Sequence, residues 1–368
     1  MQHRRFGKTN LPYSVFSLGT MRCLASPQVM EQTVQRAIEL GINHIETARG
    51  YGKSEEFLGS ALRSVDRDCI FLTTKLPPSL DAAQTEQLID QSLQRLQIDS
   101  IESVAIHGLN TWEHLDWIKT ENGCMKAIQT AIADRRVRHV GFSTHGFLDL
   151  ILAAIKTDLF EFVNLHYSFF FQRNAAAIEL AHQKDMGIFI ISPADKAGML
   201  HTPPQTLIDL CAPFSPLELN YRFLLSDRRI TTLSVGAANP EELNLAYSAA
   251  ALSDEEIKAI ERLKSRSAID PDHCSQCFAC LPCPESIHIP EVLRLRNLAT
   301  AYDMTSFGEY RYRMFENSGH WFPGNKGNRC TDCGECLPRC PEKLDIPRLL
   351  RETHDRLNGK PGRRLWQD

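Results

Sequence analysis

The residues whose spacing has the clearest chemical meaning are eight cysteines in the last quarter of the chain. They form two runs, and each run ends in the dipeptide Cys-Pro. The first run consists of Cys274, Cys277, Cys280 and Cys283, and the second of Cys330, Cys333, Cys336 and Cys340. Thiolates separated by two residues can converge on one inorganic centre. The spacing therefore predicts that all eight side chains are metal ligands.

An iron–sulfur centre fits these runs best. The second run has the spacing of two-cluster ferredoxins, in which the fourth cysteine of each run ligates the other cluster. We therefore expect two 4Fe-4S clusters, one on Cys274, Cys277, Cys280 and Cys340, the other on Cys330, Cys333, Cys336 and Cys283. Zinc needs only four ligands, which leaves a third cysteine at the same spacing unexplained. A disulfide framework needs an oxidising compartment.

Composition narrows the class of protein. The 368 residues carry a formal net charge of −4, and no basic stripe with interleaved aromatic residues is present, so we expect no nucleic-acid partner. No apolar run reaches the roughly 18 residues that span a bilayer. The opening MQHRRFGKTN leads into no apolar stretch of signal-peptide length. Together with the clusters, this predicts a cytoplasmic protein without a membrane span.

Eight short apolar stretches alternate with amphipathic ones over the first 250 residues. The predicted strands cover 15–20, 42–46, 69–75, 103–107, 139–143, 162–166, 187–192 and 231–236. Nearly continuous apolar strands separated by helices indicate a parallel sheet that is buried on both faces. Eight such units predict an α/β fold, a (β/α)8 TIM barrel, and no Gly-x-Gly-x-x-Gly follows the first strand. We expect the barrel at 1–265 and a small, mainly helical ferredoxin-like domain at 266–368.

Polar side chains stand where the predicted strands end, which is the catalytic end of such a barrel. These residues are Glu46, Lys75, His107, Ser143, Asn164 and Ser192, and Tyr51 follows Glu46 by five residues. A carboxylate, a lysine, a tyrosine and a histidine on adjacent units can transfer a proton. The alternative is a structural Glu46–Lys75 ion pair with a buried structural histidine.

The segment INHIETARGYGKSEEFLG resembles the signature of the aldo-keto reductase family, and RRFGKTNLPYSVFSLGTMR, FLTTKL, HVGFST and VGAANPEEL are also similar to that family. The cysteine-rich remainder resembles a ferredoxin-type extension found in one branch of it. The resemblance implies that Tyr51 protonates a carbonyl oxygen and that Lys75 lowers the pKa of Tyr51. Glu46 would hold Lys75, and His107 would orient the substrate.

The same resemblance implies that NADP(H) or NAD(H) binds at the barrel mouth, with NADP the first expectation. The implied contacts are Gly19, Thr20, Met21, Ser143, Asn164, Ser192, Lys196, Gly198, Gly236 and Ala237. The chain also departs from the family pattern. Glu46 replaces an aspartate, and Ala238 stands where a basic residue often holds the 2′-phosphate, for which Arg228 or Arg229 is a candidate replacement.

Three functions fit these patterns. The first is an NAD(P)H-linked reductase of a small-molecule carbonyl, fused to a two-cluster electron-transfer domain. The second is a reductase fed by a ferredoxin or another electron-transfer protein, which does not use nicotinamide. The third is a non-catalytic redox or interaction module, prompted by Glu46. Hydride carriers move two electrons and a cubane cluster moves one, so the sequence leaves the link between the two chemistries open.

Overall fold

The computed structural model describes residues 1–194, 196, 198–245 and 253–359. The chain forms two compact units, one made of 1–197 with 220–251 and the other of 198–219 with 252–368. The helix Asp254–Ala268 (α10) packs within the second unit, so this division by contacts differs from the domains predicted at 1–265 and 266–368. Arg262 of α10 donates to the Leu210 carbonyl at 3.2 Å, and Tyr302 donates to the Leu263 carbonyl at 2.8 Å.

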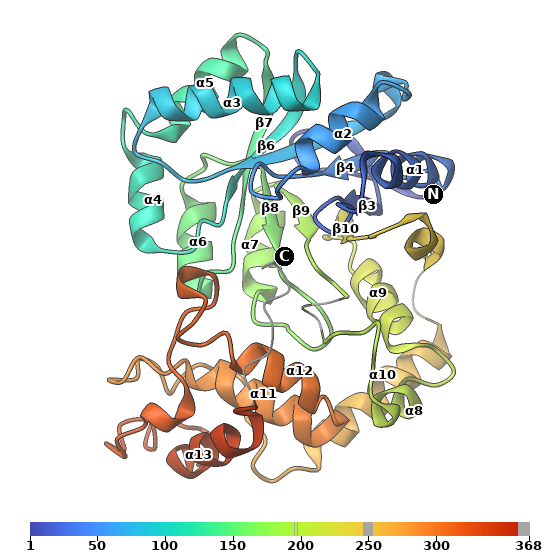
Figure 1. Cartoon of the computed structure of the whole chain (residues 1–368). Coiled ribbons are helices and arrows are strands. Elements are labelled where there is room, and N and C mark those ends of the chain that lie inside the picture. Colours follow the sequence, from blue (N-terminus) through green and yellow to red (C-terminus); the bar gives the residue numbers. More distant parts are fainter. Residues whose placement is uncertain (195, 197, 246–252, 360–368) are drawn as a thin grey trace. The chain divides into compact units, whose positions relative to one another are not determined.

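The first unit contains the predicted barrel of eight parallel strands (Figure 1). All eight predicted strands are confirmed, and the sheet closes in the order β10-β3-β4-β5-β6-β7-β8-β9. Their bounds are Phe16–Gly19 (β3), His44–Glu46 (β4), Phe71–Leu76 (β5), Ile101–His107 (β6), Val137–Ser143 (β7), Phe162–Leu165 (β8), Gly187–Ile190 (β9) and Thr232–Val235 (β10).

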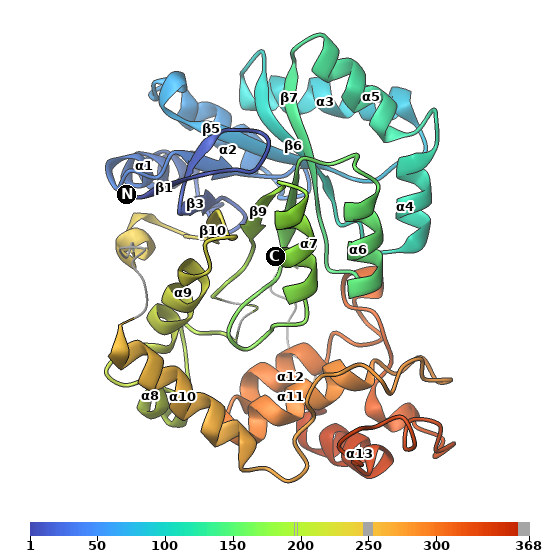
Figure 2. The same cartoon turned by 180° about the vertical axis from the view of Figure 1, so that it is seen from behind.

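Helices connect successive strands and surround the barrel (Figures 1 and 2). Capping residues mark where they begin: Ser26 accepts from the Val29 amide, and Asp81 accepts from the Gln84 amide. The helices are Pro27–Glu39 (α1), Ser54–Leu62 (α2), Ala82–Leu96 (α3), Trp112–Lys119 (α4), Cys124–Ala133 (α5), Leu148–Lys156 (α6), Ala175–Gln183 (α7) and Pro216–Ser226 (α9), with short 3-10 helices at Arg67–Cys69 (η1) and Pro240–Leu245 (η2).

A hairpin that the sequence pattern did not predict closes the N-terminal end of the barrel. It consists of His3–Arg5 (β1) and Pro12–Ser14 (β2). Tyr13 stacks on Phe6 with ring centroids 4.5 Å apart, and Phe6 lies 5.2 Å from Phe162. These rings exclude water from that end of the barrel.

A layer of polar side chains crosses the barrel interior above the hairpin. Ser17 Oγ lies 2.7 Å from both Thr232 Oγ1 and His44 Nδ1, and His44 Nε2 lies 2.8 Å from Thr73 Oγ1. Side chains two residues apart on a strand point to the same face. Two residues further along the same four strands come Gly19, Ser234, Glu46 and Lys75. The hydrogen-bonded layer therefore supports the layer that contains the predicted acid–base residues.

The second unit is mainly helical, as predicted. Its helices are Gln205–Cys211 (α8), α10, Ile289–Tyr302 (α11), Thr305–Tyr312 (α12) and Ile346–Leu357 (α13), with short 3-10 helices at Gly319–Trp321 (η3) and Gly327–Arg329 (η4). A capping box between Ser253 and Glu256 begins α10. The cysteine runs lie in irregular segments before α11 and before α13.

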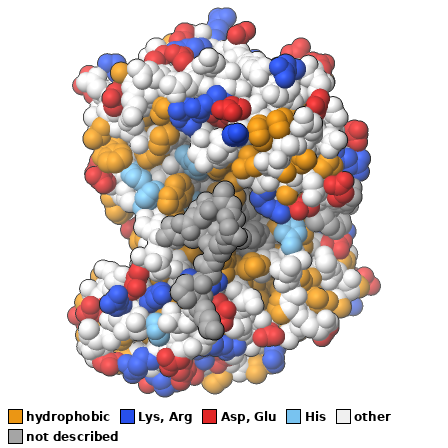
Figure 3. All heavy atoms as spheres, in the orientation of Figure 1, with side chains coloured by type: hydrophobic (Ala, Val, Ile, Leu, Met, Phe, Trp, Pro, Cys, Tyr) orange, Lys and Arg blue, Asp and Glu red, His pale blue; other side chains and the backbone are white. Residues whose placement is uncertain are grey.

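Charged side chains of both signs are interspersed on the face of the molecule in Figure 3. Across the described ranges, every helix is too short or too polar to cross a bilayer.

Candidate active site

Three acceptors surround the ammonium group of Lys75 at the carboxyl end of β5. Lys75 Nζ forms an ion pair with Glu46, donates to the Thr47 carbonyl at 2.9 Å and lies 3.3 Å from the hydroxyl of Tyr51. An ammonium group has three donors, so each finds one acceptor. The side chain of Lys75 is only 1% exposed and that of Glu46 only 7%. The pair is thus shielded from water, where its mutual attraction is strong.

The second carboxylate oxygen of Glu46 also has a partner. Ser234 of β10 donates from its hydroxyl to Glu46 Oε1 at 3.0 Å. A Cβ atom at Gly19 would lie 2.5 Å from Ser234 Oγ and 3.2 Å from Glu46 Oε1. Glycine at 19 therefore leaves the space that the longer glutamate and its serine partner occupy. Sequence reasoning missed Ser234; its only signal was a hydroxyl residue on the same face of the strand as Thr232.

Tyr51 reaches this site from the loop that follows β4. Its amide donates to the Ala48 carbonyl at 3.0 Å, which turns the chain before α2 begins at Ser54. Lys75 Nζ lies 4.8 Å from the centre of the Tyr51 ring. His107, the last residue of β6, faces the same ring edge-on at 5.6 Å. The structure thus brings together all four predicted acid–base residues.

Burial controls the protonation of this cluster. It raises the pKa of Tyr51 above its ordinary value, although the nearby Lys75 acts in the opposite direction. Desolvation alone would lower the pKa of Lys75, but Glu46 and Tyr51 outweigh it and leave that pKa raised. Desolvation, with smaller contributions from Lys75 and Lys196, lowers the pKa of His107 to about 3. At neutral pH the tyrosine carries its proton, the lysine is charged and the imidazole is neutral.

Ser143 and Asn164 lie beside His107 at the same end of the barrel, because His107 pairs with Ser143 and Ser143 with Asn164 in the strand register. The Ser143 hydroxyl accepts from the Gly108 amide at 3.1 Å. Asn164 is fully buried, and within the described part of the chain neither its amide nitrogen nor its amide oxygen has a partner. An amide side chain offers both a donor and an acceptor, so Asn164 can bind a polar group at this end of the barrel through either atom.

The other residues predicted to bind the dinucleotide differ in their burial and backbone conformation. Thr20 is buried and donates to the Glu46 carbonyl at 3.0 Å, whereas Met21 is 47% exposed. Ser192 follows β9 with a φ of +50°. Lys196 lies near enough to His107 to lower its pKa.

Gly198, at the end of the predicted phosphate loop, belongs to the second unit. Its φ is +149°, and a Cβ atom there would lie 2.3 Å from Met304 Cε. The backbone conformation therefore favours glycine at this position, because other residues are strained at this φ.

The turn after β10 is occupied by a carboxylate of the chain itself. Glu242 accepts from the Ala238 amide at 3.1 Å and from both terminal nitrogens of Arg22 at 2.7 and 3.1 Å. Arg22 also donates to the carbonyl of Gly236, and Ala237 is buried. Arg229, a candidate phosphate ligand, is paired with Asp227 and Glu179. The contact between Arg22 and Glu242 was not predicted, because 220 residues separate them.

The eight cysteines of the two runs line two cavities in the second unit. One is lined by Cys283, Cys330, Cys333 and Cys336, the other by Cys274, Cys277, Cys280 and Cys340. Each set contains three cysteines of one run and the last cysteine of the other. Within the part of the chain that the structure describes, no three His, Cys, Asp or Glu side chains converge on a single metal ion.

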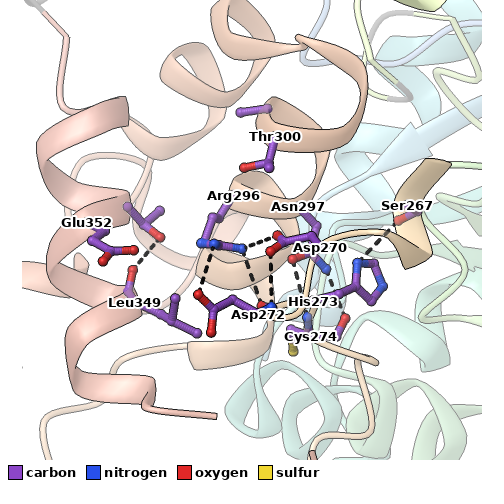
Figure 4. Close-up of polar contacts among 12 residues, drawn as sticks. Ser267, Asp270, Asp272, His273, Cys274, Arg296, Asn297, Thr300, Leu349 and Glu352 are labelled. Atoms are coloured by element: carbon purple, nitrogen blue, oxygen red, sulfur yellow. Dashed lines mark hydrogen bonds and ion pairs between the residues drawn. The ribbon is translucent and has the colours of Figure 1, made fainter.

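Polar contacts hold the loop that begins the first run (Figure 4). The side chain of Asn297 on α11 accepts from the Cys274 amide at 3.3 Å and donates to its carbonyl at 2.9 Å. Arg296 binds Asp270 at 2.6 Å and donates to the carbonyl of Asp272 at 3.3 Å. These contacts between protein groups alone hold the loop against α11. Sequence reasoning missed Asn297, which lies on a helix beyond the first run.

We predict that His107 stays neutral in the folded protein down to about pH 5. The unfolded chain takes up a proton near the ordinary pKa of about 6.5, so stability is lost as pH falls from there toward 3. At pH 5 the loss from His107 is about 2 kcal/mol. NMR titration of ¹³C-histidine-labelled protein, with His107→Gln to assign the signal, measures this; a midpoint near 6.5 for His107 would contradict it.

Comparison with known proteins agrees with this geometry. Residues 16–265 match the aldo/keto reductase family and residues 273–344 match a 4Fe-4S dicluster domain. An uncharacterized oxidoreductase, YqkF, of Bacillus subtilis (strain 168) is 23% identical over 302 residues, covering 71% of this chain and 96% of the relative. Methylglyoxal reductase DkgA of Yersinia pestis is 37% identical over 114 residues, covering 28% of this chain and 40% of that protein.

A solved aldo-keto reductase, AKR11C1 from Bacillus halodurans in its holo form, has the same fold. Its TM-score is 0.62 at 21% identity, over 71% of this chain and 96% of that one. The family match covers more than half of the chain and includes every barrel strand. The chain therefore belongs to the aldo/keto reductase family and carries a C-terminal 4Fe-4S dicluster domain.

Proposed function

We propose that this protein reduces the carbonyl group of a small molecule with a nicotinamide dinucleotide, and that Tyr51 donates the proton. The observation that carries this proposal is the buried Lys75 ammonium, which contacts Glu46 and Tyr51 together. A structural ion pair alone would not need the tyrosine hydroxyl at 3.3 Å. The non-catalytic alternative was prompted by glutamate in place of aspartate at position 46. The ion pair argues against it, because the longer carboxylate of Glu46 still reaches Lys75.

The proton comes from the hydroxyl of Tyr51. Its raised pKa keeps the hydroxyl protonated at neutral pH, which is the form that a general acid requires. When the proton moves to the carbonyl oxygen, the phenolate that remains lies beside the charged Lys75. Glu46 and the Thr47 carbonyl hold that ammonium in place. A neutral His107 can donate a hydrogen bond to the same carbonyl oxygen and so orient it.

Asn164 fits the cofactor that the family match implies. The carboxamide of a nicotinamide has one donor and one acceptor group, which would satisfy both unpartnered atoms of the buried Asn164 amide. When bound, the dinucleotide supplies the hydride. We propose that the residues that hold it are Gly19, Thr20, Met21, Ser143, Asn164, Ser192, Lys196, Gly198, Gly236 and Ala237.

We further propose that two 4Fe-4S clusters occupy the cysteine-lined cavities, with the ligand exchange between runs described above. Each cavity presents four thiols, which is the ligand number of one cubane cluster. The clusters supply electrons one at a time and make a ferredoxin or another electron-transfer protein a natural partner. We propose a reducing, cytoplasmic location, because cysteines that hold such clusters must stay reduced.

These cavities also support a second function, in which the clusters feed electrons to the substrate without nicotinamide. Three cysteines, Cys277, Cys333 and Cys69, are exposed, and two of them belong to the cluster runs. An exposed ligand is accessible to a protein electron donor. The two functions differ in the source of the hydrogen that reaches the carbonyl carbon.

We predict that Tyr51→Phe lowers turnover of methylglyoxal about 10²–10⁴-fold, because the variant loses its proton donor. Methylglyoxal is the probe because DkgA of Yersinia pestis is named as its reductase. Nucleotide binding, followed by fluorescence quenching, should persist. Tyr302→Phe is the control, because it makes the same exchange on α11, where the hydroxyl donates to the Leu263 carbonyl. Retained activity in Tyr51→Phe would refute the assigned role.

Contrary to the NADP expectation drawn from the resemblance, we also predict a preference for NADH over NADPH. A 2′-phosphate at the turn after β10 would meet the Glu242 carboxylate, which already occupies both the Ala238 amide and Arg22. Glu242→Gln removes that charge and releases Arg22, so the ratio of the NADPH Kd to the NADH Kd should fall about tenfold, equivalent to about 1.4 kcal/mol.

The matched control for this experiment is Glu241→Gln, which removes the same charge from the exposed neighbouring residue. Its Kd ratio should stay within about twofold of the wild-type ratio, a difference below 0.5 kcal/mol. Tighter binding of NADPH than NADH by the wild-type protein would contradict the preference, and an equal response of the two variants would exclude Glu242 as its cause.

A further inference from the structure

The two cysteine runs offer an internal comparison, because each begins with the same backbone geometry. Gln276 precedes the second cysteine of the first run and Asp332 precedes the second cysteine of the second run. Their φ angles are 59° and 57°, both left-handed. The backbone N–H of Gln276 also points to the sulfur of Cys274, and the backbone N–H of Asp332 points to the sulfur of Cys330. The two positions therefore share their backbone geometry but carry different side chains.

The side chain of Gln276 donates to a predicted cluster ligand. Its Nε2 lies 3.3 Å from Cys274 Sγ and 2.8 Å from the carbonyl of Pro290. The second contact fixes the amide orientation, because only the nitrogen can donate to a carbonyl. One hydrogen of the amide group is thereby directed at the Cys274 sulfur.

Asp332 presents a carboxylate at the equivalent place. Its Oδ1 lies 3.9 Å from Cys330 Sγ. A ligating sulfur is a thiolate and has no hydrogen to donate, so this approach brings two negative groups together. Arg351 binds Asp332 at 2.5 Å, but both side chains are more than half exposed, and water screens such a pair.

Reduction adds one electron, and hence one negative charge, to a cubane cluster without breaking a bond or moving a proton. A hydrogen bond to a ligand sulfur stabilises the added charge, and a nearby carboxylate destabilises it. Other charged groups line the cavities, namely Glu342 in one and Glu285 with Arg339 in the other. Substitution at 276 or 332 leaves those groups unchanged.

We propose that Gln276 and Asp332 are a pair of tuning residues that shift the two cluster potentials in opposite directions. Gln276 raises the potential of the cluster on Cys274, Cys277, Cys280 and Cys340, and Asp332 lowers that of the cluster on Cys330, Cys333, Cys336 and Cys283. The inference rests on the proposed two-cluster function. It gives the two sites distinct roles in accepting and passing on an electron.

The test is an anaerobic redox titration of the full-length, cluster-loaded protein, with dithionite as reductant and EPR as the readout. Gln276→Met keeps the side-chain length and removes the donor. At the wild-type midpoint of the affected cluster, its ratio of reduced to oxidised form should fall about tenfold, equivalent to a shift of about 59 mV. Asp332→Asn should raise the midpoint of the other cluster. Gln205→Met makes the same exchange at an exposed residue of α8 that lines neither cavity, so it is the control and should shift neither midpoint.

Unchanged midpoints in both variants, or a shift of the same cluster in both, would overturn the inference. The iron content per chain distinguishes failure of this inference from failure of the two-cluster proposal. About eight iron atoms per chain support two cubane clusters, whereas about four would overturn the two-cluster proposal together with the inference. If Gln276→Met does not load iron, the response to Asp332→Asn still decides the outcome.

Discussion

The candidate active site depends on the buried ion pair between Lys75 and Glu46. Removing two charges from water costs several kcal/mol for each ion, and such a pair persists only when its remaining donors and acceptors are satisfied. Here Thr47, Tyr51 and Ser234 provide those partners. The ion pair in turn sets the position of the tyrosine hydroxyl and the charge beside it. The longer side chain of Glu46 is accommodated because Ser234 binds it and Gly19 leaves it room.

Much of this arrangement was predictable from sequence, because its causes are local or repetitive. Parallel strands covered on both faces are apolar along their length, so eight strands were recognisable, and their last residues named the candidate acid–base set. Cysteine spacing likewise predicted which thiols would line each cavity. The hairpin was missed because HRR and PYS are short and largely polar.

Contacts between residues far apart in the chain were not predictable. Ser234 meets Glu46 only because the barrel closes between β10 and β3, and Glu242 meets Arg22 for the same reason. The resemblance implied that Lys75 lowers the pKa of Tyr51, whereas in the structure burial outweighs Lys75 and leaves that pKa raised. The packing of α8 against α10 was also not predictable, because 52 residues separate the contacting Leu210 and Arg262.

The central claim is that a hydride from nicotinamide, and not electrons from the clusters, reaches the carbonyl carbon. The direct measurement is reduction of methylglyoxal by the cluster-loaded protein with NADH deuterated at both C4 positions, followed by mass spectrometry of the product. If the hydride comes from nicotinamide, each product molecule carries one deuterium on its carbinol carbon. Product without deuterium, formed equally well by dithionite-reduced protein in the absence of nucleotide, would contradict it.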